Sequence, residues 1–242
     1  MKKIPGYLLA LFLFTGFMTL ADQFETDIIK TSAGDLEITF IDHATLMFVF
    51  GGKVIHIDPV KRAADYTKLP KADLILVTHN HPDHFDPHTI RKISDDSTRL
   101  VVTRKIAEKI EGGIIMDNGE TISVEGLEIE AVPAYNIVHM RSSGKPYHPR
   151  GVGNGYVITF GDKKVYVAGD TENTPEMKNM KDIDVAFLPM NVPYTMTPEM
   201  VADAAKAFKP GILYPYHYGK TDTSIIQKLL EGTGIEVRIR KM

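Results

Sequence analysis

One nine-residue stretch, Thr78 to Asp86, constrains this chain more than any other part of its sequence. It reads Thr-His-Asn-His-Pro-Asp-His-Phe-Asp, and so places four possible metal ligands within six residues: His79, His81, Asp83 and His84. The apolar run from Leu74 to Val77 directly before it is short and β-branched, which predicts a buried strand. We therefore expect the four side chains where a strand ends in a loop, a place where a rigid scaffold presents chemistry.

The spacing of these side chains suits metal binding. His79 and His81 are two residues apart, so both imidazoles project to the same side of an extended backbone. Asp83 and His84 follow a turn marked by Pro82 and can reach a second position nearby. Imidazole and carboxylate ligands together favour zinc, with manganese or iron possible at similar sites. A loop that is rich in histidine by chance is the competing interpretation, and the buried strand before it disfavours that alternative.

The pattern His-x-His-x-Asp-His after a strand resembles the signature of the metallo-β-lactamase superfamily of binuclear metallohydrolases. Its longer form, which begins at Thr78 and ends at Asp86, is most similar to one branch of that superfamily. This branch holds ascorbate-6-phosphate lactonases and N-acyl-phosphatidylethanolamine-type phospholipases D. The resemblance implies an α+β fold, a four-layer αββα sandwich with two divalent metal ions at one edge of two packed sheets. It also implies three further ligands in the remaining chain.

Two of those ligands are assigned by resemblance to strand ends. Asp170, in Ala-Gly-Asp-Thr, matches the carboxylate that bridges both metals, although an ordinary turn aspartate after glycine is the alternative. His217, after the apolar run 212–216, matches the last ligand, and the neighbouring Tyr216 is a candidate to line the substrate pocket. The resemblance also implies that Asp58 supports the metal loop, Thr78–Asp86, without binding metal itself. His43 is expected to be a core or pocket-wall histidine rather than a ligand.

The third histidine comes from the long irregular segment 133–155, because loops of that length inside a compact domain are usually functional. His148 is preferred, since the superfamily carries this ligand in a loop just before a strand, and His139 is the runner-up that could instead line a substrate cleft. Arg141, Lys145 and Arg150 give the loop a basic character, which indicates either recognition of an anion or an ordinary solvated loop. The implied ligand set is His79, His81 and His148 for one metal, Asp83, His84 and His217 for the other, with Asp170 between them.

The segments around the metal loop predict a mixture of strands and helices that begins with an antiparallel sheet. Leu36–Ile41 alternates in polarity, the glycines at 51 and 52 form a turn, and Val54–Ile57 returns. Helices are expected at about 88–94, 105–110, 197–208 and from about 223, and later strands at 100–103, 120–124, 127–132, 156–160, 164–168, 184–189, 212–217 and 235–239. No internal repeat is visible in the sequence.

Residues 1–21 have the layout of a secretory signal peptide, and residues 22–242 are expected to form one hydrolase domain. Lys2 and Lys3 precede the apolar run Tyr7–Leu20, and Thr19 and Ala21 supply small residues at positions −3 and −1 of a cleavage site. That run is shorter than the ~20 residues of a membrane-spanning helix, so we expect cleavage, export to the periplasm or the medium, and no stable membrane span afterwards. An uncleaved anchor is the alternative. The chain has no cysteine, which excludes disulfides and thiolate ligands.

The expected activity is hydrolysis by a hydroxide that two metal ions activate, on an ester, lactone or phosphodiester bond. Asp83 or Asp170 could take up a proton during the reaction. The expected partner is a small, anionic substrate, and a formal charge of −3 argues against non-specific nucleic-acid binding. Two alternatives are a non-enzymatic metal-binding envelope protein and a di-iron oxidoreductase of the same fold.

Overall fold

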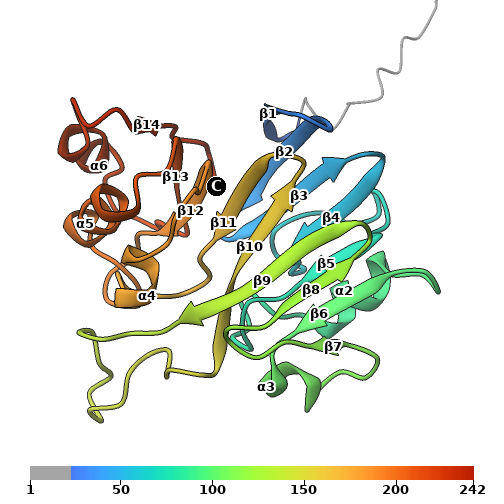
Figure 1. Cartoon of the computed structure of the whole chain (residues 1–242). Helices are drawn as coiled ribbons and strands as arrows, with labels where there is room; N and C mark the ends of the chain where they lie inside the picture. Colours follow the sequence, from blue (N-terminus) through green and yellow to red (C-terminus); the bar gives the residue numbers. More distant parts are fainter. Residues whose placement is uncertain (1–22) are drawn as a thin grey trace, which may run out of the picture.

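The computed structural model describes residues 23–242, and the predicted signal peptide lies outside this range. Two seven-stranded sheets pack face to face, and helices cover the outer face of each sheet (Figure 1). The four-layer αββα sandwich implied by the resemblance is therefore confirmed. No helix within residues 23–242 is long and apolar enough to cross a bilayer.

The first sheet contains its strands in chain order. They are β1 (Glu25–Thr31), β2 (Gly34–Asp42), β3 (Thr45–Phe50), β4 (Lys53–Ile57), β5 (Leu74–Leu76), β6 (Arg99–Val102) and β7 (Ile114–Ile115). The pairs from β1 to β4 are antiparallel and those from β4 to β7 are parallel. Parallel neighbours need a crossover, and α2 (Pro87–Ile93) and α3 (Arg104–Ala107) lie in two of these connections. Strand β1 was not predicted, because its sequence has only two apolar residues, one of which is exposed.

The second sheet repeats this arrangement. Its strands are β8 (Thr121–Val124), β9 (Leu127–Ala134), β10 (Gly153–Phe160), β11 (Lys163–Val167), β12 (Val185–Pro189), β13 (Ile212–Tyr216) and β14 (Glu236–Val237). The pairs from β8 to β11 are antiparallel and those from β11 to β14 are parallel. Helices α4 (Pro175–Lys178), α5 (Pro198–Phe208) and α6 (Ser224–Leu229) connect its later strands. The chain is thus a topological duplication that its sequence does not reveal.

Three buried apolar clusters fill the three spaces between the four layers. The central cluster joins the inner faces of both sheets and includes Phe48 and Phe187, whose rings lie 5.9 Å apart. A second cluster lies between the second sheet and α4, α5 and α6, and a third lies between the first sheet and α2 and α3 (Figure 1). Strands buried on both faces explain why β5 and β12 read as continuous apolar runs.

The parallel part of each sheet determines where functional side chains gather. In such sheets the carboxyl ends of neighbouring strands meet at one edge, where ligands usually bind. Asp58 follows β4 and His79 follows β5 in the first sheet, while Asp170 follows β11 and His217 follows β13 in the second. The backbone of Asn154 donates to the carbonyl of Thr78 at 2.8 Å, which joins the two sheets at this edge.

Candidate metal centre

Eight histidine and aspartate side chains gather at this edge in two groups of four. The first group is His79, His81, His148 and Asp170, and the second is His43, Asp83, His84 and His217. Within each group the potential ligand atoms lie within 4.8 Å of one another, so each group can hold a metal ion. The structure brings all seven predicted ligands together and adds His43, which the sequence analysis placed in the core or pocket wall.

Asp170 lies between the two groups and presents one carboxylate oxygen to each. Its Oδ2 atom is 3.1 Å from His148 Nε2 and 3.7 Å from His79 Nε2. Its Oδ1 atom is 3.3 Å from His84 Nε2 and 3.4 Å from His217 Nε2. A carboxylate in this position can bind a cation on either side.

Four buried ligand atoms in this centre have no hydrogen-bond partner among residues 23–242. They are His79 Nε2, His84 Nε2, His217 Nε2 and Asp170 Oδ1. Burial of an unpaired polar atom is unfavourable, and native proteins usually satisfy such atoms. Because the four atoms converge on the same space, their donor set fits divalent metal ions.

The orientation of His79 and His84 depends on one buried carboxylate, that of Asp58. Its two oxygens accept from the Thr78 backbone N–H and the Thr78 hydroxyl, both at 2.7 Å, and from His84 Nδ1 at 2.7 Å. The Thr78 hydroxyl donates its one proton to Asp58, so it accepts from His79 Nδ1, 3.0 Å away. Both imidazoles therefore carry their proton on Nδ1 and direct Nε2 to the centre, as metal-binding histidines commonly do.

His148 is oriented by Asn136, which lies in the same long segment 133–155. Asn136 Oδ1 accepts from the backbone N–H and from Nδ1 of His148, both at 2.8 Å. Asn136 Nδ2 in turn donates to Glu172 Oε1 at 3.1 Å and to the Tyr194 carbonyl at 2.9 Å. His148 Nε2 is thereby left to face His81 and Asp170.

Glu172 anchors the same loop and determines the place of His139. Its buried carboxylate accepts from three consecutive backbone N–H groups, those of residues 137 to 139, and from His139 Nδ1 at 2.7 Å. His139 is therefore bound to Glu172 rather than to the metal centre. Of the two candidate histidines of this loop, the structure places His148 in the cluster. Glu172 follows the Ala-Gly-Asp-Thr motif directly, and only its position there could have indicated a role.

Two imidazoles of the first group, those of His79 and His81, are held in the neutral, ligand form. Burial, with the adjacent His148, lowers the pKa of His81 to about 4. Burial, with His84 nearby, lowers the pKa of His79 well below its ordinary value. For Asp170, burial by itself would raise the pKa, but the neighbouring His217 and His84 outweigh it and hold this pKa well below the usual range. Neutral imidazole and ionised carboxylate are the forms that bind metal.

His43 enters the second group through an unusual backbone conformation. It follows β2 with φ 57°, and His217 also has a positive φ of 47°. The His217 backbone N–H donates to the His43 carbonyl at 2.7 Å, and the two rings lie 3.8 Å apart. His43 Nε2 is also 3.4 Å from Asp83 Oδ2. These contacts connect the end of β2 in the first sheet to the end of β13 in the second, and fix the positions of Asp83 and His217.

A cavity of about 330 Å³ opens onto the metal centre. Its lining residues are His81, Asp83, Arg141, Tyr147, His148, Asp170, Asn191, Tyr194 and His217. Arg141 is on the wall, whereas His139 is not part of it. Tyr216 is fully buried in the central core, so its predicted contact with substrate is wrong. Tyr147, Asn191 and Tyr194 were missed, because nothing in their local sequence distinguishes them from other loop residues.

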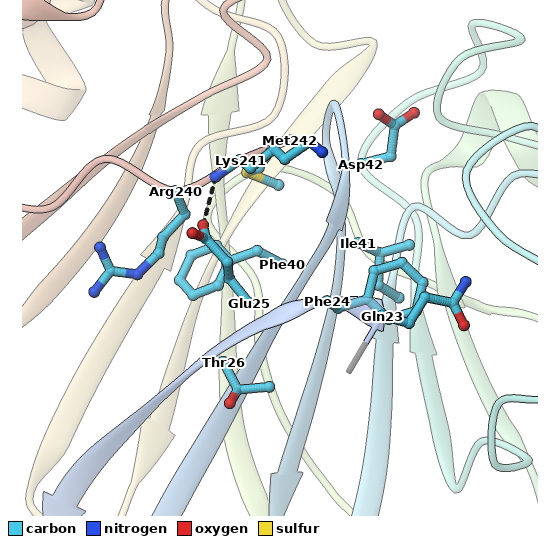
Figure 2. Close-up of a pocket in the computed structure, with 10 residues that line it drawn as sticks. All are labelled: Gln23, Phe24, Glu25, Thr26, Phe40, Ile41, Asp42, Arg240, Lys241 and Met242. Atoms are coloured by element: carbon cyan, nitrogen blue, oxygen red, sulfur yellow. Dashed lines mark hydrogen bonds between the residues drawn. The ribbon is translucent and has the colours of Figure 1, made fainter. Parts of the chain in front are cut away.

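A larger cavity, of about 710 Å³, lies where the two ends of the described chain meet (Figure 2). The Lys241 backbone N–H donates to Glu25 Oε2 there at 2.6 Å (Figure 2). The Arg240 guanidinium binds the Asp27 carboxylate on β1 at 2.7 and 2.8 Å. None of its ten lining residues belongs to the histidine and aspartate cluster. The smaller cavity is therefore the candidate active site.

Comparisons with known proteins agree with this fold and site. A family model described as "Beta-lactamase superfamily domain" matches residues 37–217, a range that contains all eight clustered residues. A UPF0173 metal-dependent hydrolase of Methanopyrus kandleri is 31% identical over 221 residues, which cover 84% of this chain and 95% of the relative. Another from Thermoplasma acidophilum is 36% identical over 202 residues, covering 78% and 85%.

Two solved structures extend the comparison. A protein of Parabacteroides distasonis, assigned as a metal-dependent hydrolase, shares 48% identity with a TM-score of 0.87 and covers 90% of this chain and 99% of its own. Igni18, a metallo hydrolase of Ignicoccus hospitalis, shares 26% identity with a TM-score of 0.70 and covers 85% and 95%. The similarity therefore extends over nearly the whole of both proteins.

Proposed function

This chain belongs to the β-lactamase superfamily and, within it, to the UPF0173 family of metal-dependent hydrolases, and on that premise we propose that it hydrolyses a small-molecule substrate with metal-activated water. The observation that carries the proposal is the convergence of four buried, unpaired ligand atoms from His79, His84, His217 and Asp170. They lie beside a cavity that can admit a substrate.

The site is proposed to hold two divalent ions, with zinc the best match to its nitrogen and oxygen donors and manganese or iron possible. His79, His81 and His148 would bind one ion, and Asp83, His84 and His217 the other. Asp170 would bridge them, since each of its oxygens faces a different group. His43 holds Asp83 and His217 from the side and completes the second group.

The bound ions would supply hydroxide near neutral pH and polarise the bond to be broken. The chain's own residues orient the reaction. Asp83 lines the cavity with a side chain that is 34% exposed, so its carboxylate can contact substrate or water directly. Asp170 is only 4% exposed and lies deeper. We assign proton uptake to Asp83 on this ground, and a charge-neutralising role to Asp170.

The bond is proposed to be an ester, lactone or phosphodiester, and Arg141 on the cavity wall supports an anionic substrate. The narrower placement, among ascorbate-6-phosphate lactonases and N-acyl-phosphatidylethanolamine phospholipases D, remains a prediction. Export through the segment 1–21 is likewise a proposal, supported by its Lys-Lys, apolar and small-residue layout. Sequencing the N-terminus of protein recovered outside the cytoplasm tests it: a start near Asp22 supports export with cleavage, an intact Met1 contradicts cleavage, and absence of the protein from that fraction contradicts export.

The hydrolase proposal is tested by a substrate screen of the zinc-loaded protein across lactones, phosphodiesters, phospholipids and β-lactams. At least one class should be hydrolysed, activity should disappear with a chelator, and added metal should restore it. Activity that resists complete metal removal would contradict the proposal. Arg150→Gln is a suitable control variant, because Arg150 is exposed, pairs with Glu176 at 2.6 Å and lies outside the cavity lining.

A further inference from the structure

The nine residues that line the cavity divide into two sets. Five belong to the proposed metal centre, which leaves Arg141, Tyr147, Asn191 and Tyr194. These four come from two loops, one between β9 and β10 and the other after β12. They are therefore the residues available to hold the part of a substrate that does not react.

The two tyrosines form an aromatic wall. The rings of Tyr147 and Tyr194 are 5.2 Å apart at 79°, an edge-to-face geometry that aromatic pairs prefer. Tyr194 is 47% exposed. Five of the nine large apolar residues that the described chain exposes lie in these same two loops: Ile137, Val138, Met140, Val192 and Tyr194. Exposed apolar side chains concentrated in the two loops that line a polar cavity indicate a binding surface.

Arg141 adds a cation to this wall. Its guanidinium lies 4.8 Å from the centre of the Tyr147 ring and donates to the Tyr147 carbonyl at 3.3 Å. No carboxylate among residues 23–242 lies within 4.0 Å of it, whereas Arg150 in the same loop pairs with Glu176. A guanidinium has five N–H donors, so most of those of Arg141 remain available for an anion.

The wall is held in place before any ligand binds. Asn136 Nδ2 donates to the Tyr194 carbonyl at 2.9 Å and so ties the second loop to the first. The Arg141 backbone N–H donates to the Lys145 carbonyl at 2.8 Å, which closes a turn beneath the guanidinium. Pre-organisation of this kind lowers the entropy cost of binding.

We propose that Arg141, Tyr147 and Tyr194 form a recognition subsite for an apolar group that carries an anionic oxyacid. The tyrosines contact the apolar body, and Arg141 binds the carboxylate or phosphoryl oxygens. This inference rests on the proposed function, because the group recognised is the non-reacting part of the hydrolase substrate. Such a subsite would favour substrates whose non-reacting part is an amphiphilic acid over those in which it is a fully polar sugar phosphate or an uncharged group.

Binding of three matched probes to the zinc-loaded protein tests the subsite: naphthoate, naphthylphosphonate and the neutral naphthamide. The chain has no tryptophan, so naphthyl fluorescence excited at wavelengths longer than those tyrosine absorbs reports the probe alone. At least one acid should bind about tenfold more tightly than the amide, the scale of one charge-assisted hydrogen bond at a partly exposed site. The acid whose affinity exceeds that of the amide by the larger factor shows whether the subsite prefers a carboxylate or a phosphoryl group.

Three variants separate the contributions of the guanidinium and the aromatic ring to probe binding. Arg141→Gln should remove the preference for the acid, Tyr194→Ala should weaken all three probes to a similar extent, and Arg150→Gln should change nothing. If Arg141→Gln leaves acid binding intact while a chelator abolishes it, the metals hold the acid and the subsite is refuted. Probe binding requires no turnover. A protein that binds the acid through Arg141 but hydrolyses nothing would contradict the proposed function and leave the subsite standing.

Discussion

The two halves of the molecule have the same strand topology but contribute differently to the centre. In each half the fourth strand begins with a lysine whose Nζ binds the aspartate directly before the next strand, Lys53 with Asp73 and Lys163 with Asp184, both at 3.1 Å. The same aspartate also accepts a backbone N–H from the fourth strand, at 2.8 and 2.9 Å respectively. Up to this point the halves are built alike.

They diverge where the fourth strand ends. In the first half Asp58 follows β4 at once and lies beneath the metal loop. In the second half two more residues intervene after β11, and they carry Asp170 into the centre. Gly169 makes this possible, because it has φ +64° and an added Cβ would lie 2.8 Å from the Asn154 carbonyl oxygen. One strand end thus supplies an aspartate that orients ligands, and its counterpart supplies an aspartate that is placed to be one.

Replacement of the second-half aspartate should have the largest effect. Asp170→Asn keeps the shape of the side chain but removes the charge between the two groups, so bound cations would repel each other. We expect kcat/KM to fall by roughly 10³-fold, the upper range for loss of one charge-stabilising group. Steady-state kinetics measures this, and a variant that retains wild-type kcat/KM would contradict the bridging role.

The long loop of the second half gives the next largest effect. His148→Ala removes an imidazole from the first group, and we expect activity to fall by more than about 100-fold with loss of metal. His139→Ala is the matched variant, since His139 binds Glu172 instead. It should retain its metal and mainly change KM. Kinetics and metal content of both variants check this, and the reverse outcome would move the ligand to His139.

The first-half aspartate should matter less than its counterpart. Asp58→Asn deprives His84 Nδ1 of a carboxylate acceptor and disturbs the Thr78 contact to His79. Partners of this kind typically contribute 10–100-fold to metal affinity or activity, so a loss of about that size is expected. Competition with a chelator of known affinity measures it. A loss equal to that of Asp170→Asn would remove the distinction between the two strand ends.

The smallest effect is an acid sensitivity that His56 gives to the first half and that its counterpart Tyr166 does not give to the second. His56 in β4 and Tyr166 in β11 occupy equivalent outward positions and are both fully buried. Burial lowers the pKa of His56 from 6.5 to about 4. Below pH 6.5 the His56 imidazole is protonated in the unfolded chain but stays neutral in the folded chain. The free energy of unfolding therefore decreases as the pH falls from 6.5 towards 4.

This linkage destabilises the fold by about 2 kcal/mol between pH 7 and pH 5. His56→Gln should remove that part of the pH dependence while its amide can still bond the Pro70 carbonyl, which His56 Nε2 contacts at 3.2 Å. Urea unfolding of metal-free protein at both pH values measures the difference. An identical pH dependence in wild type and variant would show that His56 does not contribute.

The comparison also explains what the sequence could predict. The first half concentrates its ligands in one stretch after an apolar strand, so local spacing was enough to propose a metal site. Asp170, His148 and His217 are isolated in sequence, and only resemblance to a family pointed to them. The duplication is not visible as a repeat in the sequence, because topology is set by apolar patterning that many different residues satisfy; the matching Lys–Asp pairs stand out only once the strands are aligned.

The remaining misses depend on long-range contacts. Asn136, Glu172 and Tyr194 acquire their roles only when three loops distant in the chain meet, and His43 joins the cluster through a left-handed backbone conformation. Tyr216 was a different kind of error. Side chains alternate along a strand, so Tyr216 points to the same face as Tyr214, into the core between the sheets.

The central claim is that the unpaired atoms of this centre hold two metal ions. The most direct test is the metal content of wild-type protein after zinc loading and extensive dialysis, measured by plasma mass spectrometry against protein concentration. We expect close to two zinc ions per chain, both removed by a strong chelator. A ratio that stays at one or below, in folded protein with excess zinc supplied, would contradict a two-metal centre.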